Sequence, residues 1–284
     1  MIPFLLPFRD PQGNKSTFGH VLSICGCERY QGAAVLAALG AIRCGTGLIT
    51  AAFPRQAYAP IAAKLTEAIM LPLPGNRQGT LHVSALPMLR EALQGKSVVL
   101  LGCGLGLNAN TIELTRTLLQ EITLPIVLDA DGLQATGINA ATAHKLTLGR
   151  HFILTPHPGE FARLTGLSVE EIQRNRTQLA QQFAEDHSCA LVLKGAGTVV
   201  AAPGHVPYIN TTGNAGLAKG GSGDLLAGII ASLLAQGMPP FEAAACGVYL
   251  HGMAADRVAE RLSQRGMTAL DVANELPGML SLFE

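Results

Sequence analysis

The sequence predicts an α/β protein in which helices cover both faces of a mostly parallel sheet. Three observations support this class. Short apolar segments recur along the 284 residues, longer segments of helical character separate them, and glycine or aspartate follows several of the apolar segments. Parallel strands that are buried on both faces and joined by crossover helices have this pattern. Because the chain contains no internal repeat, low-complexity tract or long linker, we predict one domain over residues 1–284.

Each expected element follows from its local composition. Short apolar runs predict strands at residues 20–25, 48–53, 68–71, 97–101, 125–128, 152–154 and 190–193, and a short hairpin at 199–202 and 206–209. Alanine- and leucine-rich or amphipathic segments predict helices at residues 32–43, 54–65, 85–93, 109–122 and 168–184, followed by three helices that complete the chain. Pro54 is compatible with a helix because proline is tolerated in the first turn.

The overall composition excludes some classes of partner. Hydrophobic residues make up 48% of the chain and charged residues 14%, so the charged surface is thin and we expect a homo-oligomer, with a tetramer among the expected forms. Twenty basic and twenty acidic residues cancel and form no basic stripe, which argues against nucleic acid and membrane as partners. A nucleotide held by backbone amides remains compatible with this charge balance.

The cysteines and the N-terminal segment predict a cytoplasmic location. The six cysteines form no Cys-x-x-Cys pair, and the close couple Cys25-Gly26-Cys27 lacks second partners at metal-site spacing. We therefore expect buried free thiols. The first ten residues are apolar but contain two prolines and no basic segment before them, which is not typical of a secretory signal.

The most informative stretch is residues 210–224, which ends at Asp224. It contains five glycines in eleven residues, and an apolar run from Leu225 to Ala235 follows it as a predicted buried helix. Exposed amides that lead into a helix N-terminus form an anion site, with the carboxylate of Asp224 at its mouth. The alternative is a capped core helix in which Ser222 and Asp224 only stabilise the first turn. A P-loop is excluded because its Gly-x-x-x-x-Gly-Lys-Ser/Thr spacing is absent.

Four further loops follow predicted strands. They are residues 102–106, 129–132, 155–160 and 194–198. Ligands of open parallel sheets bind beyond the carboxyl ends of the strands, so we expect these loops to converge with residues 220–224. The first of them is not a Rossmann fingerprint, because position 107 is leucine where glycine is required, and an ordinary tight turn remains an alternative.

Several polar residues in these loops are open to two interpretations. Asp129 and Asp131 have the chemistry of metal or water ligands, but Asp131 could equally cap a loop. Prolines on both sides of His157 stiffen the loop that presents it and Glu160, although Glu160 could simply be a first-turn acid. Residues 194–198 suit either a phosphate or a hairpin turn. The other histidines are expected to be structural: His20, His82, His144, His151, His187, His205 and His251.

Six motifs taken together resemble one known family. They lie at residues 30–34, 128–133, 155–160, 193–198, 213–228 and 265–271, and in this order they resemble the ADP/ATP-dependent NAD(P)H-hydrate dehydratases. The resemblance implies a ribokinase-like three-layer α/β/α fold and, at this length, a stand-alone dehydratase domain. It also implies dehydration of the S-form of hydrated NADH or NADPH, driven by ADP or ATP with Mg²⁺. With ADP, the products would be NAD(P)H, AMP and phosphate.

The resemblance also implies roles for individual residues. Asp224 would be the catalytic base. The hydrate would contact Ala33, Gly104, His157 and Asp224. The nucleotide and its phosphates would be held by Lys194, Gly195, Ala196, Gly197, Thr198, Gly220, Gly221, Ser222 and Gly223. Glu160 lies where related kinases keep a Mg²⁺-linked glutamate, but no metal ligand is assigned from the sequence.

Three departures from the family pattern keep other functions open. Cys25 and Cys27 stand where small residues are usual, Ala215 replaces a common proline, and Lys219 replaces a small residue or threonine. Lys219 would either contact phosphate or point to solvent. The alternatives are a ribokinase-like kinase of a small alcohol or vitamin, and a nucleotide-binding member without catalysis. The residues alone decide neither ADP against ATP nor NADH against NADPH.

Overall fold

A nine-stranded sheet forms the centre of the computed structural model, which describes residues 3–135 and 152–284. The spatial order is β3-β2-β1-β4-β5-β6-β7-β8-β9. All pairings from β3 to β7 are parallel, and β7, β8 and β9 pair antiparallel, which confirms the predicted hairpin. The strands are β1 His20–Ile24, β2 Leu48–Pro54, β3 Ile69–Leu73, β4 Val98–Leu101, β5 Ile126–Leu128, β6 Phe152–Leu154, β7 Ala190–Leu193, β8 Val199–Ala201 and β9 Tyr208–Ile209.

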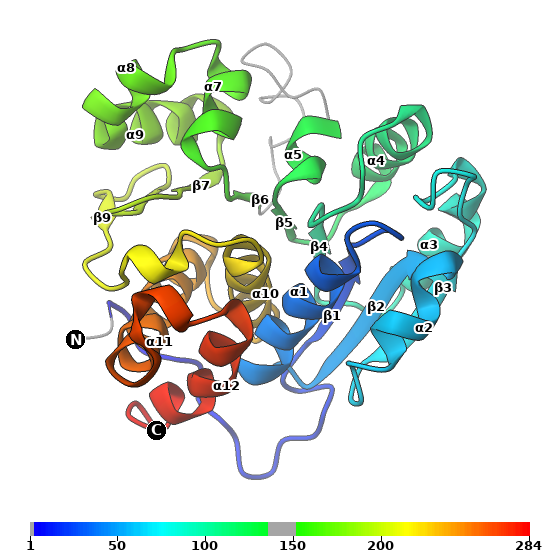
Figure 1. Ribbon diagram of the computed structural model, residues 1–284, viewed down its shortest axis with the longest axis horizontal. Coiled ribbons are helices and arrows are strands. Elements are labelled where there is room, and N and C mark those ends of the chain that lie inside the picture. The colour runs from blue at the N-terminus through cyan, green and yellow to red at the C-terminus, as the bar shows by residue number, and fades with distance from the viewer. Residues whose placement is uncertain (1–2, 136–151) are drawn as a thin grey trace.

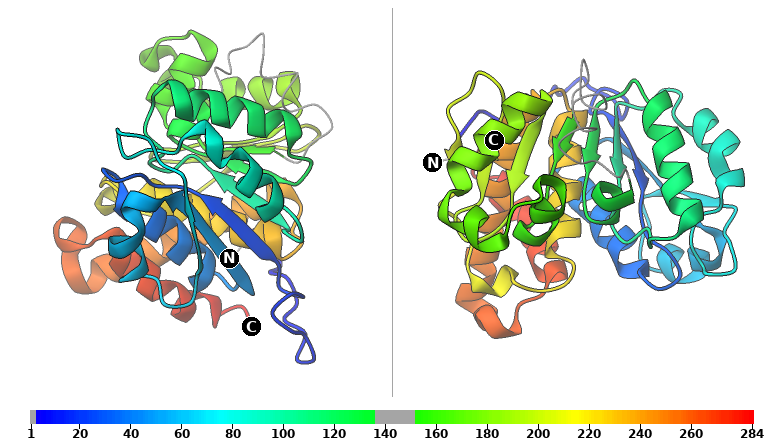
Figure 2. Two further views of the ribbon diagram at one scale, coloured as in Figure 1. Left: turned by 90° about the vertical axis from the view of Figure 1, so that its right-hand side faces the viewer. Right: turned by 90° about the horizontal axis from the view of Figure 1, so that it is seen from above.

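Helices cover both faces of this sheet (Figure 1, Figure 2). They are α1 Gln31–Arg43, α2 Tyr58–Ala62, α3 Leu86–Ala92, α4 Ala109–Glu121, α5 Asp131–Ala135, α7 Pro158–Thr165, α8 Val169–Arg174, α9 Arg176–His187, α10 Ser222–Ala235, α11 Pro240–Gly266 and α12 Ala269–Leu280. Successive strand residues point to opposite faces, so Val98 packs in the core with α1, α10 and α11, whereas Val99 packs in the core with α4 and α9. The predicted three-layer architecture is therefore confirmed.

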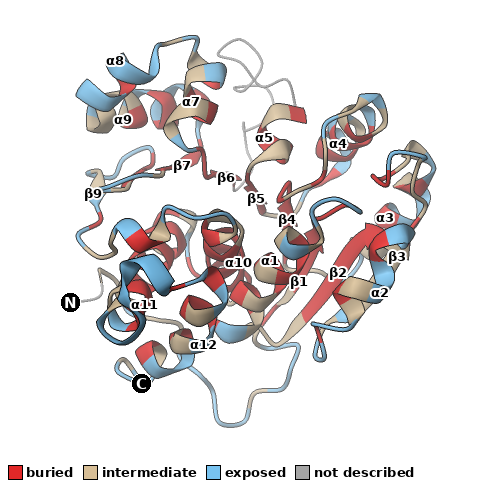
Figure 3. Cartoon of the chain, in the orientation of Figure 1, coloured by how far each residue is buried: buried red, intermediate tan, exposed pale blue. Residues whose placement is uncertain are grey.

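The buried helix α10 lies against α1 on one face of the sheet, and nearly all of it is buried in Figure 3. Two glycines allow this close approach. A Cβ atom at Gly228 would lie 2.0 Å from the carbonyl oxygen of Ala37, and one at Gly40 would lie 2.3 Å from the carbonyl oxygen of Leu225. Any side chain at these positions would force the two helices apart. The packing fixes α10 so that its N-terminus lies at the carboxyl edge of the sheet.

Two predicted helices differ from those observed. Residues 168–184 form α8 and α9 rather than one helix, because Asn175 has φ −125° and ψ 30° and separates them. Asparagine is unfavourable inside a helix because its side chain competes for backbone hydrogen bonds. Residues 54–65 contain only the short turn Arg55–Ala57 and α2, and Pro54 ends β2.

In the part of the chain that is described, no helix combines the length and apolar character needed to cross a bilayer. Two of the histidines expected to be structural, His144 and His151, lie outside the described residues.

Candidate active site

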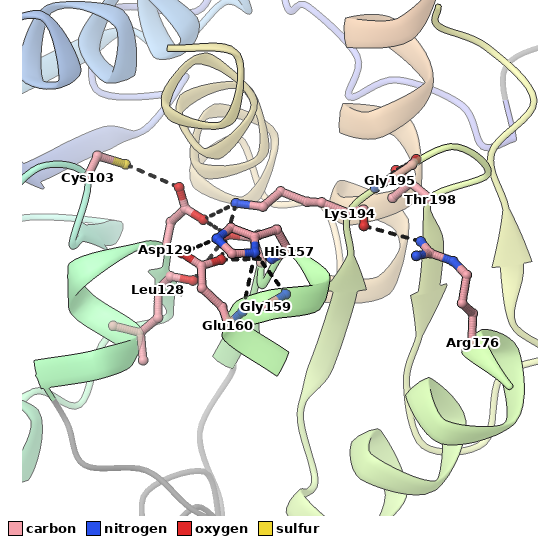
Figure 4. Close-up of polar contacts among 11 residues, drawn as sticks. Cys103, Leu128, Asp129, His157, Gly159, Glu160, Arg176, Lys194, Gly195 and Thr198 are labelled. Carbon is pink, nitrogen blue, oxygen red and sulfur yellow. Dashed lines mark hydrogen bonds and ion pairs between the residues drawn. The ribbon is translucent and has the colours of Figure 1, made fainter. Parts of the chain in front are cut away.

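The loops after β5, β6 and β7 meet at the carboxyl edge of the sheet, as predicted. Asp129 follows β5, and one of its carboxylate oxygens, Oδ1, accepts hydrogen bonds from two neighbouring loops. The hydroxyl of Thr155 donates at 2.7 Å, and the ammonium of Lys194 donates at 2.6 Å. Figure 4 shows Lys194 reaching across from the end of β7 toward Asp129.

The Asp129–Lys194 ion pair is almost fully enclosed. The side chain of Asp129 is 2% exposed and that of Lys194 is 17% exposed. Burial lowers the pKa of Lys194, but the charges of Asp129 and Glu160 outweigh this effect and raise it above its usual value. Lys194 is therefore a permanent cation at the edge of the sheet. Arg176 fixes the backbone of this segment by donating to the carbonyl oxygens of Leu193 and Lys194, at 2.7 and 3.2 Å. Figure 4 shows the bond to Lys194.

Asp224 lies in the first turn of α10, which begins without a side-chain cap. The N-cap is Gly221 at φ +95°, and no side-chain oxygen among the described residues accepts from the first amides. The alternative of a side-chain-capped helix is therefore wrong, although Ser222 and Asp224 do lie in the first turn, as that alternative expected. The first amides of a helix have no partner within it, so that of Gly223 is available to an anion, whereas that of Ser222 donates to the carbonyl oxygen of Lys219 at 3.4 Å. A side chain at Gly221 would clash with Leu36, because its Cβ would lie 2.4 Å from Cδ1.

The carboxylate of Asp224 lies close to other ionisable groups. One oxygen of Asp224, one of Asp129 and the Sγ of Cys103 all lie within 4.8 Å of one another. Burial raises the pKa of Asp224 to about 6, and the charge of Asp129 adds to this shift, whereas Lys194 and the thiol of Cys103 oppose it. Asp224 is thus mostly ionised near neutral pH, yet basic enough to accept a proton.

A cavity of about 530 Å³ opens between the loops after β7 and β9 and the helices α10 and α11. All five residues from Lys194 to Thr198 line it, together with Ser222 and Gly223. Gly220 and Gly221 are not among the described residues of its wall. Residues that the sequence did not assign to the site complete the wall: Asn210, Thr211, Thr212, Gly213, Asn214, Ala215, Leu217, Ala218, Leu226, Val248, His251 and Gly252. Most of them belong to the glycine-rich stretch, but nothing near His251 in the sequence indicated a site.

The residues expected to contact the hydrate lie in two places. Gly104 and Ala33 are neighbours, since a Cβ at Gly104 would lie 2.8 Å from the Cβ of Ala33. Cys103, beside Gly104, points its thiol at Asp129 over 3.7 Å. This links Gly104 to the cluster around Asp224. His157 lies outside the lining of the 530 Å³ cavity, with its side chain 54% exposed.

His157 and Glu160 cap the start of α7 reciprocally. The Nδ1 atom of His157 accepts from the amides of Gly159 and Glu160, at 3.0 and 3.2 Å. The carboxylate of Glu160 accepts from the amide of His157 at 2.7 Å (Figure 4). Glu160 is therefore a first-turn acid, and its carboxylate also lies 3.9 Å from the ammonium of Lys194. The sequence left open whether Glu160 is presented to a ligand or is a first-turn acid. The capping contacts account for its position as a first-turn acid.

Two other open interpretations are decided by direct contacts. Asp131 accepts from the amide of Gly106 at 2.8 Å, so it caps that loop.

Lys219 neither faces a phosphate site nor points freely to solvent. Its ammonium donates to the carbonyl oxygens of Arg265 and Met267, both at 2.6 Å, and so ties the glycine-rich loop to the end of α11.

The carboxylates at the site suit a hard cation better than the thiol does. Asp129 and Asp224 offer oxygen atoms of the kind that Mg²⁺ prefers. Hydrogen bonding with Cys25, together with burial and the nearby carboxylates, raises the pKa of Cys103, so its thiol stays protonated. These carboxylate oxygens would therefore fit a Mg²⁺ ion.

The parallel sheet, the glycine-rich loop and the acid in the first turn of α10 define a ribokinase-like α/β protein. Solved structures agree. The chain is similar to an ADP/ATP-dependent NAD(P)H-hydrate dehydratase from Bacillus subtilis, co-crystallised with ATP and Mg²⁺, with 31% identity and a TM-score of 0.83 over 99% of this chain and 95% of the other. A ribokinase-like protein from Enterococcus faecalis is 27% identical, with a TM-score of 0.84 over 98% and 92%.

The chain belongs to the NAD(P)H-hydrate dehydratase family, whose model matches residues 21–278. It is 43% identical to a bifunctional NAD(P)H-hydrate repair enzyme from Moorella thermoacetica over 98% of this chain and 52% of that protein. It is 39% identical to an ADP-dependent (S)-NAD(P)H-hydrate dehydratase from Neisseria meningitidis over 91% and 83%. The chain thus spans about half the length of its bifunctional relatives. The family expected from the six motifs is confirmed.

Proposed function

We propose that this chain is a nucleotide-dependent dehydratase that restores the S-form of hydrated NADH or NADPH to NAD(P)H. ADP, or alternatively ATP, would donate the phosphoryl group, with Mg²⁺. The observation that carries the proposal is the carboxylate of Asp224, which is held in the uncapped first turn of α10 directly after Ser222 and Gly223, two residues that line the cavity of about 530 Å³. Asp224 itself is not among the described residues of the cavity wall. Relatives described as dehydratases favour this activity over that of a kinase. The whole of residues 1–284 would act as one domain.

The proposed reaction has two stages. Asp224 accepts the proton of the 6-hydroxyl group of the hydrate as that oxygen attacks the terminal phosphoryl group of the nucleotide. A new P–O bond forms and the bond to AMP breaks when ADP is the donor. Phosphate then leaves C6 with the electron pair of the C–O bond while water accepts a proton from C5, and the electron pair of that C–H bond restores the ring double bond. Phosphate is a good leaving group and hydroxide is a poor one, so phosphorylation makes the elimination feasible.

The residues around Asp224 suit the charge of this transfer. The amide of Gly223 and the dipole of α10 favour a phosphoryl group at the mouth of the cavity. The ammonium of Lys194 lies close by, since it would be 3.3 Å from a Cβ at Gly223. Mg²⁺ held by an oxygen of Asp129 would neutralise further phosphate charge and would leave Asp224 free to act as the base. The hydrate would approach from the side of Ala33, Gly104 and His157.

An assay with the hydrate tests the proposal. The protein is incubated with the S-form hydrate, Mg²⁺ and either ADP or ATP. We expect the near-ultraviolet absorbance of the dihydronicotinamide to return, with one free phosphate released for each molecule restored. A kinase would instead accumulate a phosphorylated alcohol without free phosphate. A protein that binds nucleotide but turns over neither the hydrate nor small alcohols would be a non-catalytic member of the family.

The pH dependence of the reaction is a second expected result. Because Asp224 must be ionised to accept a proton, protonation through its pKa of about 6 should inactivate the enzyme. We expect kcat/KM to be flat near neutral pH and to fall about tenfold per pH unit below pH 6. Initial rates across buffers of constant ionic strength measure this profile. A profile without an acid limb in this range would exclude Asp224 as the base.

We also propose a cytoplasmic homo-oligomer, with a tetramer among its expected forms. All six cysteines are free and buried, which suits a reducing compartment. The low content of charged residues, 14%, supports self-association.

A further inference from the structure

His251, on the inner face of α11, lines the 530 Å³ cavity and is 5% exposed. Its Nε2 atom is buried and has no hydrogen-bond partner among the described residues. Buried polar atoms are nearly always paired, and leaving one unpaired costs stability. A polar group beside a ligand cavity that lacks a partner in the protein is therefore a candidate for pairing with the ligand.

The imidazole of His251 is neutral at physiological pH. Burial lowers its pKa to about 4, and the charge of Lys194 adds to this shift. A neutral ring offers one donor and one acceptor but no charge. It is poorly suited to a phosphate, which the ammonium of Lys194 and the amide of Gly223 serve better. Its chemistry instead matches the hydroxyl groups of a ribose or the polar edge of a base.

The wall around His251 is rigid and largely apolar away from the phosphate end. The hydroxyl of Thr212 donates to the carbonyl of Tyr249 at 2.9 Å, and the amide group of Asn210 donates to the carbonyl of Val248 at 3.2 Å. These bonds hold the loop after β9 against α11 two and three residues before His251. The side chains of Leu217, Leu226 and Val248 line the same cavity and could contact a flat base.

We propose that His251 is a specificity-determining residue of the nucleotide site and that its imidazole hydrogen-bonds to the nucleoside half of the adenine nucleotide. This inference rests on the proposed function only in requiring that an adenine nucleotide occupies this cavity. His251 takes no part in proton transfer, so it acts on nucleotide affinity and not on the chemical step.

Two substitutions of similar size test this role. His251→Leu removes both ring nitrogens, whereas His251→Gln keeps a polar atom near the position of Nε2. Titration calorimetry with ADP should show binding weakened about 2- to 12-fold in the leucine variant, as expected for one lost hydrogen bond between neutral groups. The glutamine variant should recover most of this loss. In steady-state kinetics the loss should fall on the KM for nucleotide rather than on kcat or the KM for hydrate.

The melting temperature without nucleotide separates this role from a structural one. Leucine removes an unpaired buried polar atom, so the leucine variant should melt at the same temperature as the wild type or higher. If the leucine variant binds ADP as tightly as the wild type, the inference is wrong. It is also wrong if both variants lose binding and melt early together. The proposed function can fail separately. If the wild type does not dehydrate the hydrate but the leucine variant still binds ADP more weakly, the proposed function is overturned and this inference stands. If the wild type binds no adenine nucleotide, both are overturned.

Discussion

Replacing Asp224 by asparagine is expected to lower kcat by about 10²- to 10⁴-fold, the usual contribution of a general base. Asparagine preserves the size of the side chain but cannot accept the proton of the attacking hydroxyl. The amides of Ser222 and Gly223 and the other residues that line the cavity remain in place. The dissociation constant of ADP, measured by calorimetry, should therefore change much less than kcat.

Asp131→Asn is the matched control for this experiment. Asp131 is a second carboxylate at the same edge of the sheet, and burial also raises its pKa. Its carboxylate accepts from the amide of Gly106 at 2.8 Å, and the amide oxygen of asparagine can accept the same bond. We expect kcat of the control within tenfold of the wild type. Equal losses in the two variants, or full activity in Asp224→Asn, would remove Asp224 from the mechanism.

The sheet and the meeting point of the loops were predictable because their signals are local. An apolar run such as residues 97–101 is too short for a helix and is followed at once by glycine, so it could only be a buried strand with a tight turn. Parallel strands must end at one edge, and this geometry brought Asp129 and Lys194 together although they are 65 residues apart. The six motifs then indicated the family, although no single motif would have done so.

The features that the sequence did not predict depend on contacts between distant segments. Lys219 lies beside a predicted phosphate loop, yet its ammonium donates to two carbonyl groups at the end of α11, both at 2.6 Å. Nothing in the neighbouring residues of His251 indicates that Nε2 would be buried without a partner. The residues on both sides of Asn175 have a strong helical pattern. This pattern alone does not distinguish one continuous helix from two helices separated at Asn175.

Replacing Lys194 by methionine is expected to destabilise the protein by about 3–5 kcal/mol, because it leaves the buried carboxylate of Asp129 without its ammonium partner. Methionine has a similar length and fills the same space. Of the two donors observed at Oδ1 of Asp129, only the hydroxyl of Thr155 would remain. Urea unfolding followed by circular dichroism measures the loss, provided that the m-value is unchanged.

The double variant Asp129→Asn/Lys194→Met distinguishes an ion pair from simple packing. Asparagine is neutral and can still accept from Thr155, so no unpaired charge remains and most of the stability should return.

Both variants also remove the cation that lowers the pKa of Asp224, but only Lys194→Met retains the charge of Asp129, which raises it. The acid limb of kcat/KM should therefore move to higher pH in Lys194→Met. In the double variant it should lie at or below its wild-type position, because Asp129 raises the pKa of Asp224 more than Lys194 lowers it. Equal stability of the two variants would mean that the pair does not balance a buried charge. An acid limb that stays near pH 6 in Lys194→Met would mean that Lys194 has no electrostatic effect on Asp224.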